Sequence, residues 1–212
     1  MISGSEVEWV SPEKFKSIEE LKEAPGDFYM VHLYPEVELA RFFDPKQFAK
    51  IVLIRDPKDV MISFLHHIAE KKKWVYSPQF DHQKFVSLSF DEKLRETLLF
   101  HYPNPLSCLP YAVAWMSDPS VFVCRFEDLV GEKGGGTASA QQTTLLALAS
   151  FIGHPIESKR AAEIGNALFG ETWTFRAGQI GSGEKVYNTE NKLLFQKLVQ
   201  GMMKDLGYQE TW

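Results

Sequence analysis

The stretch Lys50–Phe64, with the sequence KIVLIRDPKDVMISF, decides the fold of this chain. It begins with the apolar run Ile51–Ile54, which is too short for a helix and is typical of a strand buried on both faces. Asp56 is a good helix N-cap and Pro57 fits the first helical position, so a helix is expected to follow directly. A strand, a short polar turn and a helix form the start of a βα unit. In open α/β sheets ligands bind at the carboxyl ends of the strands, which is where this pattern puts Arg55.

The helix after the turn has its own pattern. Val60, Phe64 and Ile68 recur at four-residue spacing, which predicts one buried stripe. Ser63 lies two turns along the same helix. Arg55 offers a planar fork of donors and Ser63 a hydroxyl, and both groups suit a phosphate.

Length and composition favour a single soluble domain over residues 1–212. The chain is 44% hydrophobic and 24% charged, as is usual for a globular protein. Its net charge of −5 argues against binding to nucleic acid or to a membrane surface. Only Cys108 and Cys124 are present, so a reduced, cytoplasmic location is expected. No apolar run is long enough to cross a bilayer, and no signal peptide is expected at the start.

Two further apolar runs predict strands. One covers Phe28–Tyr34 and includes His32, and the other covers Val121–Phe126. We expect Tyr29–Leu33, Ile51–Ile54 and Phe122–Cys124 to lie in one parallel sheet with helices packed on it. The helices that the sequence predicts downstream are Phe90–Phe100, Pro110–Met116, Gln141–Ile152 and Ser158–Leu168, and one that begins at Asn188-Thr189, faces the core with Phe195, Leu198, Met202 and Leu206, and ends at Gly207.

A glycine-containing loop, Phe175–Gly181, precedes the last of these helices. Glycine lets the backbone approach a phosphate closely, and successive N–H groups form a nest for an anion. Taken alone, the loop is more typical of a glycine-rich surface connection than of a phosphate site.

Several of these segments resemble signatures of the family of sulfotransferases that use 3′-phosphoadenosine 5′-phosphosulfate (PAPS). Arg55–Ser63 resembles the segment R-[DN]-P-[KR]-D-x-x-x-S, which binds the 3′-phosphate. Val31–Pro35 resembles K-T-H-L-P in part: His32 and Leu33 agree, Met30 and Val31 stand where the family has Lys and Thr, and Pro35 comes one residue later than the family's Pro. Phe126–Leu129 resembles Y-E-D-L with Phe in place of Tyr. Phe175–Gly181 resembles F-x-R-K-G-x-x-G, with Ala177 where the family has Lys.

The resemblance implies a P-loop-NTPase-like open parallel sheet with flanking helices. It also implies transfer of a sulfonate group from PAPS to a hydroxyl acceptor, either a small molecule or a carbohydrate. By resemblance His32 is the catalytic base, and Phe126 packs near the adenine. The groups that the resemblance assigns to the 3′-phosphate are Arg55, Ser63, Arg176, Ala177 and Gly178.

One family signature has no counterpart here. The family's P-K-S-G-T-T-W loop, which holds the 5′-phosphosulfate and supplies a Lys, is not found in this sequence. We therefore expect the chain to begin after the family's first βα unit, with a sheet edge left exposed. This leaves catalysis by the chain alone open. The alternative is a non-catalytic remnant that binds 3′-phosphoadenosine 5′-phosphate (PAP), or a protein partner that covers the exposed sheet.

A metal site is not predicted. Four of the six histidines, His66, His67, His82 and His101, lie in the middle of the chain. His66 and His67 are adjacent on a helix, where side chains point about 100° apart, and no carboxylate is spaced to complete a site.

Overall fold

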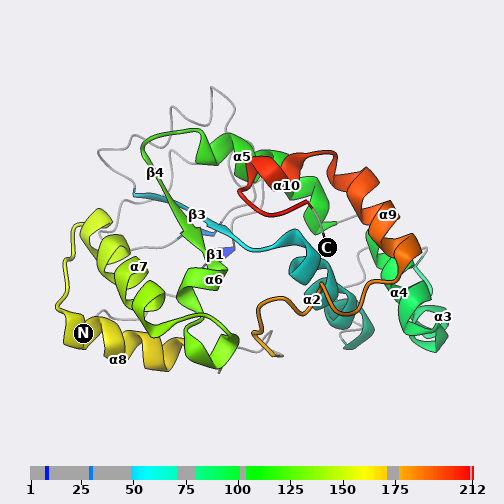
Figure 1. Ribbon diagram of the computed structural model, residues 1–212, viewed down its shortest axis with the longest axis horizontal. Helices are drawn as coiled ribbons and strands as arrows, with labels where there is room; N and C mark the ends of the chain where they lie inside the picture. Colours follow the sequence, from blue (N-terminus) through cyan, green and yellow to red (C-terminus); the bar gives the residue numbers. More distant parts are fainter. Residues whose placement is uncertain are drawn as a thin grey trace.

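The computed structural model describes residues 8–9, 29–30, 49–70, 80–100, 104–170, 177–210 and 212, and for 8–9 and 29–30 it describes the backbone only. This part of the chain has a mixed α/β architecture (Figure 1). Its strands form two parallel pairs: β1 (Glu8–Trp9) with β2 (Tyr29–Met30), and β3 (Lys50–Ile54) with β4 (Val121–Arg125).

The described helices, in chain order, are α2 (Pro57–Glu70), α3 (His82–Ser87), α4 (Phe90–Leu98), η3 (Pro105–Cys108), α5 (Leu109–Met116), α6 (Phe126–Leu129), η4 (Glu132–Gly134), α7 (Ala138–Phe151), α8 (Ser158–Leu168), α9 (Thr189–Val199) and α10 (Met202–Asp205). The predicted helices from Phe90 to Leu168 are confirmed to within three residues at each end. None of the described helices is both long and apolar enough to span a bilayer.

The pairing of β3 with β4 is confirmed as parallel, with Lys50 opposite Val121 and Ile54 opposite Arg125. Parallel neighbours need a long crossover, and here α2 to α5 supply it. The expectation of one sheet for all three apolar runs is not met in the described residues, where β2 pairs with β1 and the two strands form a pair separate from β3 and β4. The Glu8–Trp9 strand is only two residues long, which is too short to show a periodicity in the sequence.

Helix α2 begins as predicted. The Asp56 carbonyl accepts from the Val60 N–H at 3.0 Å, and the Asp56 side chain accepts from the Lys58 N–H at 2.8 Å. The predicted stripe is confirmed only at Ile68, which is 5% exposed; Val60 and Phe64 are half-buried, while Met61 and Leu65 are fully buried. Helix α2 contacts α3, α4 and η3. The face of α2 that packs on the core is therefore rotated by about one residue from the predicted stripe.

The C-terminal helix is broken where the sequence predicted it to be continuous. Helix α9 starts at its Asn188 cap as expected, but it ends at Val199. Gln200 and Gly201 both adopt left-handed conformations, with φ of 40° and 85°, before α10 begins. Of the four residues predicted to face the core, Phe195 and Leu206 are buried and Leu198 packs half-buried against the core. After the break Met203 is buried, while the predicted Met202 is only half-buried.

Strand β3 is less covered than the sequence suggested. Ile54 is 5% exposed, but Ile51 is 41% and Leu53 62% exposed. Helix α7 packs over β4, where the rings of Phe122 and Phe151 lie 5.3 Å apart, and contacts β3 less. Among the described residues no strand pairs with the outer edge of β3. The expectation of a strand buried on both faces is therefore wrong for Ile51 and Leu53, which lie on the same face of the strand.

Candidate functional site

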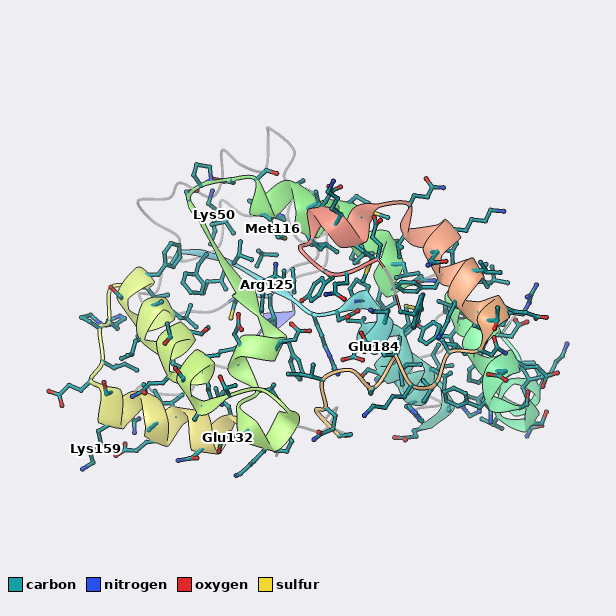
Figure 2. The ribbon with its side chains drawn as sticks, in the orientation of Figure 1. Lys50, Met116, Arg125, Glu132, Lys159 and Glu184 are labelled. Atoms are coloured by element: carbon teal, nitrogen blue, oxygen red, sulfur yellow. The ribbon has the colours of Figure 1, made fainter. Side chains whose placement is uncertain are left out.

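Arg55 brings three distant parts of the chain together at the carboxyl end of β3. Its guanidinium donates to the carbonyl of Gln179 at 2.9 Å, and its central carbon lies 4.2 Å from the centre of the Phe126 ring. Phe126 starts α6 directly after β4, and Gln179 belongs to the glycine loop. Figure 2 shows the two ends of this strand pair, with Lys50 at one end and Arg125 at the other.

The Arg55 guanidinium keeps donor capacity in this arrangement. Its side chain is 19% exposed, and a terminal nitrogen lies 3.7 Å from the Asp59 carboxylate. Its Nε atom is buried and has no hydrogen-bond partner in the described part of the chain. Buried donors are nearly always paired, so an unpaired N–H on a charged group is a feature that a bound acceptor would resolve.

Asp59 fastens the glycine loop to the first turn of α2. Its carboxylate, 1% exposed, accepts from the N–H groups of Gly181 at 2.8 Å and Gly183 at 2.6 Å, and from the Ser182 hydroxyl at 3.1 Å. Gly183 allows this approach because a Cβ there would lie 2.7 Å from the Lys58 carbonyl carbon. Two N–H groups of the loop are thus bonded to an internal carboxylate and not left for a ligand.

The other side of the loop is held by the turn at η4. The Ile180 N–H donates to the Gly134 carbonyl at 2.9 Å, and the Gln179 side chain donates to the Lys133 carbonyl at 2.9 Å. Gly178 has a φ of 59°, in the left-handed region where glycine carries no steric penalty. The loop is therefore fixed between α2 and η4.

Carboxylates crowd the same edge of the sheet. The Asp56 N–H and the Tyr208 hydroxyl both donate to Glu127, at 2.8 and 2.9 Å. Burial raises the pKa of Asp56, and the nearby Asp59 and Glu127 charges raise it further against the opposing effect of Lys58. The Lys58 ammonium lies 3.6 Å from Asp56, so the charges at this end balance only in part.

A cavity of about 290 Å³ opens beside this cluster, between the glycine loop and the C-terminal segment. Glu184, labelled in Figure 2, lies on its loop side, 3.3 Å from the Lys58 ammonium. The residues that line it are Asp56, Lys58, Glu127, Ile180, Gly181, Glu184, Gly207, Tyr208 and Gln209.

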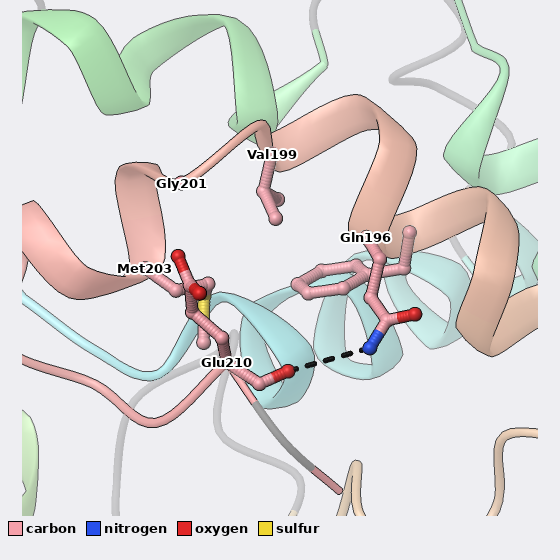
Figure 3. Close-up of a pocket in the computed structure, with 6 residues that line it drawn as sticks. Gln196, Val199, Gly201, Met203 and Glu210 are labelled. Atoms are coloured by element: carbon pink, nitrogen blue, oxygen red, sulfur yellow. Dashed lines mark hydrogen bonds between the residues drawn. The ribbon is translucent and has the colours of Figure 1, made fainter.

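A second cavity, of about 180 Å³, shares no lining residue with the first (Figure 3). It lies against α9 and α10 and is lined mainly by Phe195, Val199 and Met203. The Gln196 amide reaches across to the Glu210 carbonyl at 3.5 Å. Gln196, Gly201 and Glu210 complete the lining of this cavity, so the recess is partly apolar and partly polar.

Some of the site residues predicted from the sequence can be placed and others cannot. Arg55 and Phe126 are in contact, and Ala177 and Gly178 lie in the loop whose Gln179 carbonyl Arg55 binds. Ser63 lies on α2 and is exposed. His32 and Arg176 fall outside the described residues.

The histidines weighed as ligands show other contacts. The His82 Nε2 atom lies 3.1 Å from the carbonyls of Ile68 and Ala69, at the end of α2. The His66 ring is 6.5 Å from that of Phe90. Across the described ranges, no three His, Cys, Asp or Glu side chains are grouped so that they could bind a metal ion.

Sequence reasoning did not identify Asp59, Gln179 or Tyr208 as parts of this site. Asp59 was assigned no site role, although its fixed place in the R-[DN]-P-[KR]-D signature was a signal. Comparisons with family models, with curated proteins and with solved structures found no match to this chain.

Proposed function

We propose that this chain is a sulfotransferase-like protein that binds PAPS or PAP through its 3′-phosphate, on a P-loop-NTPase-like open parallel sheet. The observation that carries the proposal is the meeting of Arg55, Phe126 and the Gln179 carbonyl at the carboxyl end of β3. These residues come from three separate segments, each of which resembles a family signature. Ligands of open parallel sheets bind at this edge.

The residues present fit a phosphate ester. The unpaired Arg55 Nε is a charge-assisted donor of the kind that binds phosphate oxygens strongly. The exposed Ser63 hydroxyl, eight residues further along the chain in α2, offers a second donor. The Phe126 ring, which lies against Arg55, provides an apolar surface for the adenine ring of the nucleotide. In this proposal Arg176, Ala177 and Gly178 complete the phosphate contacts.

The bound donor would supply an activated sulfonate group for a hydroxyl of a small molecule or a carbohydrate. His32 would accept the proton from that hydroxyl, since an imidazole with an ordinary pKa near 6.5 suits this role near neutral pH. The chain shows no segment like the family's phosphosulfate loop, so its own positive charge at the leaving group is small. Binding is therefore expected to be better retained than catalysis.

Calorimetry tests the binding proposal. PAP should bind more tightly than AMP, because the 3′-phosphate carries most of the recognition. A charge-assisted hydrogen bond contributes about 1.5–3 kcal/mol, so Arg55→Ala should weaken PAP binding roughly ten- to a hundredfold. Lys50→Ala, at the opposite end of the strand, is the matched control and should leave affinity unchanged. Equal affinities for PAP and AMP would show that the chain has no site that recognises the 3′-phosphate.

A radiolabelled-sulfate assay separates the enzyme from the alternative, a non-catalytic remnant. We expect transfer from PAPS to be very slow or undetectable, and His32→Ala to leave folding and PAP binding nearly unchanged. Robust turnover would contradict the expectation of slow transfer, and turnover that survives His32→Ala would contradict the role of His32 as the base. The alternative is favoured further by the exposure of Ile51 and Leu53 on β3, an apolar surface that suits a covering protein partner.

A further inference from the structure

The Asp59 carboxylate is the most completely bonded acid in the described part of the site. Three donors, the Gly181 and Gly183 N–H groups and the Ser182 hydroxyl, lie within 3.1 Å of its oxygens. A buried charge is tolerated only when such partners replace water. The loop and α2 are 122 or more residues apart in sequence at these bonds, so Asp59 ties together two parts of the chain that no local structure joins.

The same carboxylate also faces Arg55. One oxygen lies 3.7 Å from the guanidinium, in an i,i+4 pair at the start of α2. That guanidinium in turn donates to Gln179, only two residues before Gly181 in the loop. Asp59, the loop and Arg55 therefore form a closed set of contacts, in which a shift of the loop would move the guanidinium with it.

We propose that Asp59 is a positioning residue, which orients the Arg55 guanidinium toward a 3′-phosphate by fixing the loop from Gln179 to Gly183. This inference rests on the proposed function. Two effects of the carboxylate oppose each other, since its negative charge repels a phosphate while its bonds hold Arg55 in place. Three donors and Arg55 already offset the negative charge of Asp59. Orientation of the Arg55 guanidinium is therefore the larger of the two effects.

The test is the ratio of AMP to PAP dissociation constants, measured by calorimetry on folded protein. Asp59→Asn keeps the shape but replaces one acceptor oxygen by an NH2 group, which cannot accept from the loop donors. We expect this ratio to fall about tenfold or more, chiefly through weaker PAP binding. Asp118→Asn is the matched control. It also replaces a carboxylate by an amide, but in the ion pair with Lys50 at the other end of the strand pair, and it should leave the ratio unchanged.

The outcomes separate this role from a purely structural one. A structural role would lower stability but leave the ratio of the folded protein unchanged, and that result overturns the proposal. Tighter PAP binding in Asp59→Asn would also overturn it, by making Asp59 only an opposing charge. If Asp59→Asn does not fold, the same ratio is measured in Ser182→Ala. A fall of about two- to fivefold in the ratio of AMP to PAP dissociation constants supports the proposal, and an unchanged ratio overturns it. Wild-type protein without any preference for PAP would contradict the proposed function itself.

Discussion

At the amino end of the β3–β4 pair two charges neutralise each other, whereas at the carboxyl end several charges share incomplete partners. The Lys50 ammonium donates to Asp118 at 2.7 Å, and this bond, with two from Ser120, lowers the pKa of Asp118 to about 2. At the other end burial raises the pKa of Asp56, and Arg55 keeps an unpaired Nε.

The difference shows which end of the strand pair is arranged for stability and which for a ligand. A closed ion pair has nothing left to offer a third group. A cluster whose carboxylates compete and whose arginine is only partly bonded is poised to respond to an added charge. The predictions below change one end at a time, in order of decreasing expected effect.

The largest effect is expected at Gly183, where a side chain would separate the loop from α2. In Gly183→Ala the new Cβ would lie 2.7 Å from the Lys58 carbonyl carbon, so the loop or the helix must move. Such overpacking costs about 2–3 kcal/mol in the free energy of unfolding, measured with urea. Gly153→Ala is the control: it meets no atom within 4 Å, and its φ of 76° costs only about 1 kcal/mol. Equal losses in the two variants would show that the Gly183 contact is not limiting.

A smaller effect is expected at the amino end. Because the folded pKa of Asp118 lies below its ordinary value of 3.8, the ionised form is favoured by folding. Its contribution is present above pH 4 and is lost as the pH falls through about 2. Lys50→Ala should lower the unfolding free energy by about 0.5–1 kcal/mol at pH 7, because the Asp118 side chain is 32% exposed and solvent weakens the pair. Urea titrations should show this difference shrinking between pH 5 and pH 2. A difference that does not depend on pH would assign the loss to packing.

The smallest effect should have the opposite sign. The raised pKa of Asp56 means that its ionised form is disfavoured by folding, so it lowers stability as the pH rises above its ordinary value of 3.8. Asp56→Asn keeps an acceptor for the Lys58 N–H and removes the charge. We expect a gain of about 0.5 kcal/mol at pH 7 that disappears near pH 3.5. Asp118→Asn, measured in parallel, should instead lose stability at pH 7. A loss in both variants would mean that the Lys58 ammonium outweighs burial.

Local chemistry explains what the sequence could predict. The β-branched run before Arg55 and the Asp56 cap are short-range signals, and both β3 and the start of α2 formed as expected. Helix α8 matched its predicted bounds, since its pattern is contained within one segment. The contact of Arg55 with Phe126 joins two segments that were interpreted separately, and the contact itself was not predicted.

The parts that were missed depend on contacts between distant segments. The Asp59 bond to Gly181 spans 122 residues, and nothing in either segment shows that the other is its partner. The pairing of β1 with β2 was missed because two residues carry no periodic pattern. The break at Gln200 is equally hidden, because a non-glycine residue in the left-handed region is uncommon.

Trp212 is positioned as an intrinsic fluorescent probe of the carboxyl end of the β3–β4 pair. Its indole lies 4.5 Å from the Tyr187 ring and 5.3 Å from the Lys58 ammonium, and the Tyr187 hydroxyl donates to the Lys58 carbonyl at 3.3 Å. Indole emission responds to a nearby positive charge. Any ligand that moves Lys58 should thus change tryptophan fluorescence while the fold stays intact, and replacing Trp212 by Phe would identify its share of the signal from the chain's five tryptophans.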